Sequence, residues 1–190
     1  MRRDVTIWYL EMSAPADLNG VDTPVELEIR RAGIPSPELS RYLYTAVGGP
    51  WHWTDRLAWT WDDWLCYLVP ERTETWLALV DGTPVGYFEL VRQDDGAVDV
   101  AAFGLLPAFL GGGWGAPLLT RAVRRAWDIG AERVTVNTCS LDGPAAMPNY
   151  ARRGFRVVRE ARRVADLPDE PPGAWPGARS PGPAGSARAQ

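Results

Sequence analysis

The stretch Ala97–Gly130 constrains the fold of this chain most, because it predicts a strand, a glycine-rich turn and a helix in direct succession. Apolar residues alternate with other residues over 98–103, which is the period of two of a pleated strand. Over 118–127 they recur at three- and four-residue steps, which is typical of one face of a helix. Between these segments lies the run Gly111-Gly112-Gly113-Trp114-Gly115. We therefore expect a strand that leads through a glycine turn into a long helix.

A helix N-terminus that follows a glycine turn can bind an anion. The first amides of a helix lack partners within the helix, and the helix dipole places partial positive charge there. Glycines let the backbone approach an oxygen-rich ligand such as a diphosphate, because no side chain intervenes. The run matches neither the dinucleotide-binding pattern nor the P-loop pattern, so those two sites are not supported. A surface loop without a ligand is the alternative explanation of the glycines.

The longer stretch resembles the phosphate-binding motif of the GNAT superfamily, the acyl-CoA-dependent N-acyltransferases. In that family a strand and a proline precede the pattern [QR]-x-x-G-x-[GA], which enters a helix; here Pro107 is followed by Leu110 and then by Gly111–Ala116. Leu110 stands where the family has Gln or Arg, which removes a side-chain contact but no backbone amide. A second segment, 146–155, resembles the family's A-x-x-x-Y-x-x-x-G-F ending. The resemblance covers about residues 23–164.

The predicted elements follow the order β-α-α-β-β-β-α-β-α-β, which is the order of the GNAT fold. We therefore expect an α/β (α+β) domain over residues 23–166. Its sheet is expected to be mixed and mostly antiparallel, with helices on both faces and a V-shaped splay between the central strands. Residues 1–22 are expected to form an N-terminal arm. Residues 167–190 are rich in Pro, Gly and Ala and are expected to be a disordered tail, because such a composition buries too little apolar surface to fold.

Composition excludes several other classes of function. The formal net charge of −4 does not supply the basic surface of a nucleic-acid-binding protein. Two cysteines and a single histidine, His52, predict neither a disulfide framework nor a metal site. The sequence shows no signal peptide and no membrane span, so we expect a cytoplasmic protein without nucleic-acid or membrane partners.

The resemblance implies acetyl-CoA as the acyl donor and assigns residues to its binding. The diphosphate would accept hydrogen bonds from the backbone of the glycine turn, and the pantetheine arm would bind along the preceding strand. The implied cofactor-binding residues are Phe103, Gly104, Leu105, Gly111, Gly112, Gly113, Trp114, Gly115 and Ala116. Gly104 has an alternative explanation, because a glycine inside a strand also marks a bulge or the close packing of a helix.

Acyl transfer to an amine needs a proton donor for the leaving thiolate and a group that takes the amine proton. The resemblance implies Tyr150 as the donor, on a helix expected to start near Pro148, because proline is tolerated in a first turn. Glu89 and Asp99 are the candidate bases, because apolar neighbours can raise a carboxyl pKa; each could equally be a solvated acid. The strand register decides whether the two share a face of the sheet, and Glu89 ranks first because it lies mid-strand.

A tryptophan-rich segment over residues 51–64 falls where the family has its acceptor-binding loop. Aromatic rings beside carboxylates suit a cationic amine, so we assign acceptor binding to Trp51, Trp53 and Asp55. The alternative is a hydrophobic cluster that anchors two helices onto the sheet.

Together these features predict an N-acetyltransferase that moves an acetyl group from acetyl-CoA to a primary amine by direct attack. The acceptor would be a small-molecule or peptide amine, and a homodimer is left open. Two alternatives remain. One is a non-catalytic acyl-CoA-binding or sensing module on the same fold, and the other is an interaction protein that uses its tryptophans.

Overall fold

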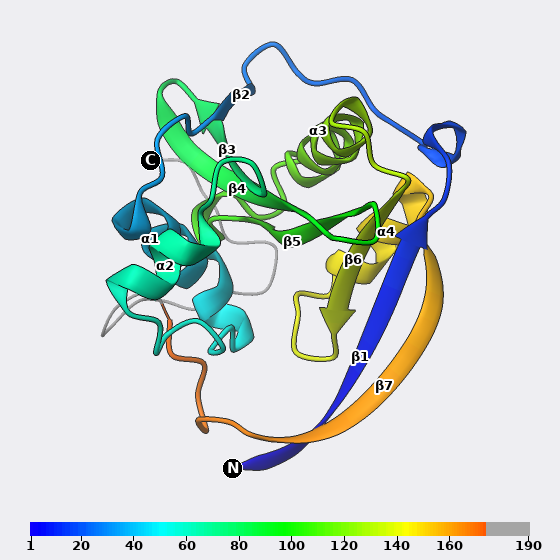
Figure 1. The fold of residues 1–190 in the computed structure, drawn as a ribbon. Coiled ribbons are helices and arrows are strands. Elements are labelled where there is room, and N and C mark those ends of the chain that lie inside the picture. Colours follow the sequence, from blue (N-terminus) through cyan, green and yellow to red (C-terminus); the bar gives the residue numbers. More distant parts are fainter. Residues whose placement is uncertain (174–190) are drawn as a thin grey trace.

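The computed structural model describes residues 1–173, which form one seven-stranded sheet in the order β2-β3-β4-β5-β6-β1-β7 (Figure 1). The strands are β1 (Arg2–Met12), β2 (Glu28–Arg31), β3 (Thr73–Val80), β4 (Thr83–Arg92), β5 (Ala97–Leu105), β6 (Arg133–Cys139) and β7 (Arg156–Asp166). The α-helices are α1 (Pro37–Gly48), α2 (Trp61–Tyr67), α3 (Gly115–Asp128) and α4 (Ala146–Arg153). From residue 174 on, the expected tail lies outside the described residues. Within residues 1–173, no helix combines the length and the apolar content that a membrane crossing requires.

The helices cover both faces of the sheet, which confirms the expected fold class (Figure 1). On one face α1 packs through Leu43 and Val47 against Tyr87 of β4 and Ala102 of β5. On the other face α3 buries one apolar side and joins the main core, in which Leu118 is fully buried. The sheet is thus the middle layer of three.

Local sequence signals explain where the first two helices begin. Ser36 precedes α1, and its hydroxyl accepts a hydrogen bond from the backbone N–H of Leu39 at 3.2 Å. Thr60 precedes α2 and forms a reciprocal capping box with Asp63. Both caps satisfy amides that the helix itself leaves without partners. α1 therefore begins at Pro37 and α2 at Trp61.

β1 lies inside the sheet, between β6 and β7, and is antiparallel to both (Figure 1). Val5, Leu10 and Met12 are each 1% exposed, so this strand contributes to the core. The sequence predicted only an N-terminal arm here and could not identify its partners. The sheet therefore includes residues that the expected domain boundary at residue 23 leaves outside.

β5 and β6 form the only parallel pair among the described strands, and they are paired only where they begin. Their pairing runs from Ala97 with Arg133 to Asp99 with Thr135. Beyond Asp99, β5 continues beside β4 and β6 continues beside β1, so the two strands diverge. This divergence is the expected V-shaped splay.

A β-bulge at Ala101 marks the point where the splay opens. On β4, Glu89 is opposite Ala102 and the next residue, Leu90, is opposite Val100, which leaves Ala101 as an extra residue in β5. Bulges bend a strand and locally increase its twist. The bulge explains why β5 leaves β6 after only a few residues.

Candidate active site

The splay opens into a cleft of about 370 Å³. Its walls come from the second half of β5, the end of β6, the starts of α3 and α4, and residues 51–56 of the connection between α1 and α2. The predicted site residues that line it are Trp51, Trp53, Asp55, Phe103, Gly104, Leu105, Gly115 and Tyr150. The fold therefore brings together residues that the sequence separates by up to a hundred positions.

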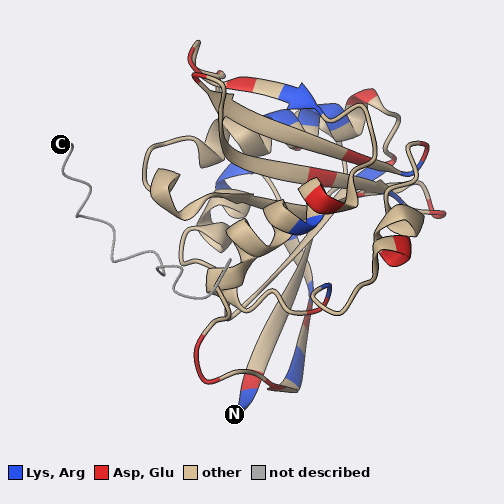
Figure 2. Cartoon of the chain, turned by 90° about the vertical axis from the view of Figure 1, so that its left-hand side faces the viewer, with Lys and Arg blue, Asp and Glu red and all other residues tan. Residues whose placement is uncertain are grey.

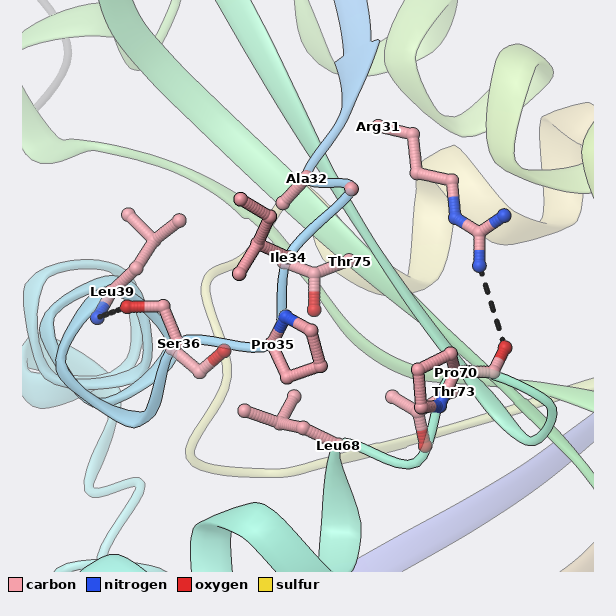
Figure 3. Close-up of a pocket in the computed structure, with 12 residues that line it drawn as sticks. Arg31, Ala32, Ile34, Pro35, Ser36, Leu39, Leu68, Pro70, Thr73 and Thr75 are labelled. Carbon is pink, nitrogen blue, oxygen red and sulfur yellow. Dashed lines mark hydrogen bonds between the residues drawn. The ribbon is translucent and has the colours of Figure 1, made fainter.

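A second cavity lies apart from this cleft, where the loop between β2 and α1 meets β3 (Figure 3). It holds only about 30 Å³, which is room for a water molecule, and it shares no lining residue with the cleft. Arg31 closes one side by donating to the carbonyl oxygen of Pro70 at 3.4 Å. This cavity is too small for a cofactor.

The glycine turn places unpartnered amides at the start of α3. Gly111 and Gly113 have φ of 81° and 85°, a left-handed conformation that favours glycine. No side chain caps the helix, which begins at Gly115. Among the described residues, no acceptor binds the backbone N–H groups of Gly111, Gly113, Trp114, Gly115 and Ala116. An anion near the start of α3 would find several donors there.

The strand residues expected to bind the pantetheine arm line the cleft along β5. Because β6 has left the ladder, the backbone of β5 beyond Asp99 has no strand partner on that side. Gly104 has a packing role as well, because a Cβ there would overlap the Val47 side chain of α1. Close packing of α1 therefore explains a glycine at position 104. The bulge of β5, the other explanation, lies at Ala101.

Tyr150 lies on α4 with its side chain only 5% exposed, yet it lines the cleft. Its ring centroid is 6.0 Å from that of Phe103 on β5, so it reaches across to the splayed strand. The helix begins at Ala146, two residues before the expected start, and Pro148 still falls within its first turn. Burial, with a smaller effect of the carboxylates of Asp142 and Asp99, raises the pKa of Tyr150. The phenol therefore stays protonated and can act as a proton donor.

Glu89 is fully buried on β4 and does not line the cleft. Its Oε2 accepts hydrogen bonds from Arg56 Nη1 at 2.8 Å and from the Tyr67 hydroxyl at 2.9 Å. Its Oε1 has no partner among the described residues. The residue ranked first as a base is thus held in an ion pair behind the cleft wall.

Arg56 lies among aromatic rings of the tryptophan-rich segment 51–64 and of the two helices beside it. Its Cζ is 4.3 Å from the ring centroid of Tyr67 and 5.1 Å from that of Trp59, and Tyr44 and Trp64 also lie within 6 Å of it. The cation–π contacts of this cluster are therefore made by a residue of the chain itself. For these rings the alternative explanation holds, namely a cluster that anchors two helices onto the sheet.

Asp99 shares a face of the sheet with Glu89. It lies opposite Val91, two residues after Glu89 on β4, and directly paired residues of a ladder point to the same side. Thr135 Oγ1 donates to Asp99 Oδ1 at 2.7 Å across the last pair of β5 and β6. Burial raises the pKa of Asp99, although Thr135 and Arg56 oppose the shift. Asp99 lies at the apex of the splay but does not line the cleft.

Asp142, which the sequence analysis missed, connects the acceptor-side tryptophans to the turn after β6. Its Oδ1 accepts from Trp53 Nε1 at 3.2 Å, and its Oδ2 accepts from Thr138 Oγ1 and from the backbone N–H of Cys139. Trp51 packs on the same turn, because a Cβ on Gly143 would come 3.1 Å from its ring. The only signal in the sequence is an acidic residue in the turn between a predicted strand and a predicted helix.

Comparisons with known proteins agree with this geometry. The family model described as the Acetyltransferase (GNAT) family matches residues 38–155. An uncharacterized N-acetyltransferase of Mycobacterium tuberculosis is 35% identical over 91 residues, which make up 48% of this chain and 58% of that relative. The chain thus spans less than two thirds of the length of the curated relatives that it matches.

Solved structures share the fold at low sequence identity. A GCN5-related N-acetyltransferase from Kribbella flavida has a TM-score of 0.63 and 20% identity, over 87% of this chain and 60% of that one. An aminoglycoside acetyltransferase from an uncultured soil metagenomic sample has a TM-score of 0.54 and 16% identity, over 66% of this chain and 86% of that one. At these identities, the likeness concerns the fold alone.

Proposed function

Because this chain belongs to the acetyltransferase (GNAT) family, we propose that it moves an acetyl group from acetyl-CoA to a primary amine by direct attack. The observation that supports this best is the continuous cleft from the start of α3 to Tyr150, Trp51 and Trp53. A thioester carrier that enters at the glycine turn would have its reactive end among these side chains.

The proposed cofactor site uses backbone rather than side chains. Diphosphate oxygens would accept hydrogen bonds from the backbone N–H groups of the glycine turn, of which those of Gly111, Gly113, Trp114, Gly115 and Ala116 have no acceptor among the described residues. The pantetheine amides would bind the free side of β5 at Phe103, Gly104 and Leu105. Leu110 lines the same cleft and would contribute apolar contact where the family has a polar side chain.

The proposed reaction forms one bond and breaks one. The amine nitrogen attacks the thioester carbonyl carbon, the C–S bond breaks, and the thiolate of CoA takes the phenolic proton of Tyr150. The proton released by the amine goes to Asp99 or Glu89. Since neither carboxylate lines the cleft, this transfer needs a water relay. Asp99 is the better acceptor for this proton, because the Glu89 carboxylate already accepts hydrogen bonds from Arg56 and Tyr67.

The acceptor side of the proposal rests on Trp51, Trp53 and Asp55. The carboxylate of Asp55 is exposed at the cleft and would attract a cationic amine. The indole rings would provide a flat apolar wall for the rest of a small-molecule or peptide acceptor. One structural neighbour is an aminoglycoside acetyltransferase, so aminoglycosides belong among the acceptors to test, with polyamines, amino acids and peptide N-termini.

Two measurements test the proposal. Calorimetric titration with CoA and acetyl-CoA should show binding, and its absence would overturn the whole assignment. Incubation with acetyl-CoA and the amine panel should yield acetylated product. Product is measured by mass, because Cys66 is exposed and would react with thiol reagents. Binding without any product across the panel would favour the non-catalytic acyl-CoA-binding module.

The amino-acid composition limits acetylation of the protein itself in this assay. The chain contains no lysine, so its own side chains offer no primary amine to acetylate. Acetylation of lysine in the protein itself therefore adds nothing to the measured product.

A further inference from the structure

The cleft extends across β1 to β7, where it meets a positive charge that has no partner. Arg163 of β7 lines the cleft. It lies opposite Val5 on β1, two residues before Ile7, which also lines the cleft, so these side chains share one face of the sheet. The neighbouring Arg162 is ion-paired with Glu160, whereas the guanidinium of Arg163 has no hydrogen-bond or ion-pair partner among the described residues.

This part of the cleft face carries positive charge that no acid balances. Over 3–9 and 159–165, the residues on the face of Ile7 are Arg3, Val5, Ile7, Tyr9, Arg159, Ala161, Arg163 and Ala165. Three of them are arginine and none is acidic. Arg159 Cζ lies 3.5 Å from the ring centroid of Tyr9, and Arg3 Nη2 donates to the backbone carbonyl oxygen of Asp169 at 3.1 Å. Figure 2 shows blue arginine segments on the two strands that run down to the N-terminus.

The charge of these arginines acts on groups that line the cleft. Burial, together with the positive charge of Arg3, lowers the pKa of His52. Burial and the carboxylate of Asp142 raise the pKa of the Cys139 thiol, and the charge of Arg163 is among the effects that oppose this rise. An anion at this end of the cleft would therefore be attracted by Arg163 directly and by Arg3 at longer range.

Of the charged side chains that line the cleft, two are already engaged within the chain. Arg56 is ion-paired with Glu89, and both carboxylate oxygens of Asp142 accept hydrogen bonds. Asp55 and Arg163 remain, and no described residue binds either side chain. The cleft thus offers one free negative group, from the connection between α1 and α2, and one free positive group, from β7. A ligand that carries both an ammonium and a carboxylate group matches this pair.

We propose that Arg163 binds a carboxylate of the acceptor, and that the acceptor is a free amino acid. This inference rests on the proposed acetyl transfer, whose acceptor it narrows. A guanidinium binds a carboxylate through two parallel N–H···O hydrogen bonds, which orient the ligand as well as hold it. Polyamines and aminoglycosides carry positive charge without a carboxylate, and Arg163 would repel them. Size agrees, because a cleft of about 370 Å³ that also holds the thioester end leaves room for a small acceptor.

Matched acceptors test the carboxylate contact. Phenylalanine is one probe, because its ring can pack against the indoles of Trp51 and Trp53, and 4-aminobutyrate is another, because its amine and carboxylate lie further apart. Each is compared with its own amide, which keeps the amine and loses the negative charge. Arg163→Gln should lower kcat/KM about tenfold for whichever acid reacts, through KM, and leave its amide unchanged. The same two compounds are compared in both proteins, so the different amine pKa values of acid and amide cancel.

Two further variants are controls. Arg163→Lys keeps the charge but loses the planar fork, so it should recover part of the lost kcat/KM. Arg162→Gln removes the same charge from the neighbouring residue, which points to the other face of β7 and is 81% exposed, and it should behave as wild type. Thermal unfolding confirms that each variant is folded.

Calorimetry separates this inference from the proposed function. Phenylalanine and 4-aminobutyrate are titrated into the protein saturated with CoA, which carries no acetyl group, so binding is measured without turnover. A Kd about tenfold weaker in Arg163→Gln supports the carboxylate contact. If no amine is acetylated in spite of such binding, the proposed function alone is overturned.

Three results would overturn the carboxylate contact. The first is acetylation in which the wild type and Arg163→Gln show the same ratio of acid to amide, which would leave the proposed function standing. The second is an equal loss for acids and amides in Arg163→Gln. The third is that neither phenylalanine nor 4-aminobutyrate binds to the wild type.

Discussion

Arg56 Nη1 lies 2.8 Å from Glu89 Oε2, and the two side chains are only 14% and 1% exposed. This ion pair joins the tryptophan-rich connection to β4 behind the cleft wall. Tyr67 of α2 donates to the same carboxylate oxygen at 2.9 Å, so three elements meet at one group. The position of Trp51, Trp53 and Asp55 at the cleft depends on the segment that Arg56 anchors.

Removing one partner of this ion pair should destabilise the fold strongly. Arg56→Met leaves the Glu89 carboxylate buried without a counter-charge, and we expect a loss of about 3 kcal/mol in the free energy of unfolding. Adding Glu89→Gln should recover a large part of the loss, because the uncompensated charge is gone. Urea unfolding measures both. The control is Arg72→Met, whose partner Asp94 is 95% exposed, and it should change stability little. Equal losses in the single and double variants would show that charge is not the cause.

Tyr150→Phe should lower turnover by about 100-fold while leaving the affinity for acetyl-CoA nearly unchanged. The phenylalanine keeps the ring that packs between Phe103 and Phe155 and removes only the proton donor. Steady-state kinetics give turnover, and calorimetry gives the affinity. Tyr42→Phe on the exposed side of α1 is the control and should behave as wild type. An unchanged turnover in the Tyr150 variant would remove its proposed role.

Gly113→Ala should weaken acetyl-CoA binding by about tenfold, because alanine strains the left-handed backbone that positions the turn. Gly130→Ala is a matched control: Gly130 has a φ of 88°, close to the 85° of Gly113, but follows the other end of α3. Neither added Cβ meets another atom within 4 Å, so both variants test backbone strain alone. Thermal unfolding should show similar losses of stability. A similar loss of cofactor affinity in both variants would contradict the proposed diphosphate site.

Asp99→Asn should stabilise the fold more near pH 7 than near pH 4. Burial raises the pKa of Asp99 in the folded state, so the folded chain holds this proton more tightly than the unfolded chain does. Stability from this group therefore falls as the pH rises from the unfolded pKa, about 3.9, through the higher folded value. Asparagine removes the titration and can still accept the hydrogen bond of Thr135 through Oδ1. Urea unfolding at the two pH values measures the difference.

The control is Asp94→Asn, which replaces a 95% exposed carboxylate in the turn between β4 and β5 and should change stability little. A pH-independent effect of Asp99→Asn would mean that Asp99 titrates alike in the folded and unfolded chains.

The sequence predicted elements whose causes are local. The turn at Gly111–Gly113 depends on residues a few positions apart, and the structure confirms the helix that follows it. Tyr150 was assigned from a motif that spans only residues 146–155, and the structure places it at the cleft. Each of these predictions depends on residues that are close together in the sequence.

The predictions that were wrong or stayed open concern residues that only tertiary contacts bring together. The bulge at Ala101 decides which face Asp99 occupies, and alternation in the sequence does not reveal an extra residue in one strand. Arg56 fills the aromatic cluster because Glu89 is buried beneath it, a contact between residues 33 positions apart. Asp142 gains its role only when the fold brings Trp53 to the turn after β6.

The position of β1 has a consequence for the order of assembly. Ile7 pairs with Cys139 on one side and with Ala161 on the other, so the first strand finds both neighbours near the far end of the chain. Contacts of such sequence separation form late, because loop closure must precede them, whereas the hairpin of β3 and β4 can form at once. During synthesis, Val5, Leu10 and Met12 would leave the ribosome long before the strands that bury them. The apolar side chains of β1 therefore stay unburied until the residues of β6 and β7 have been synthesised.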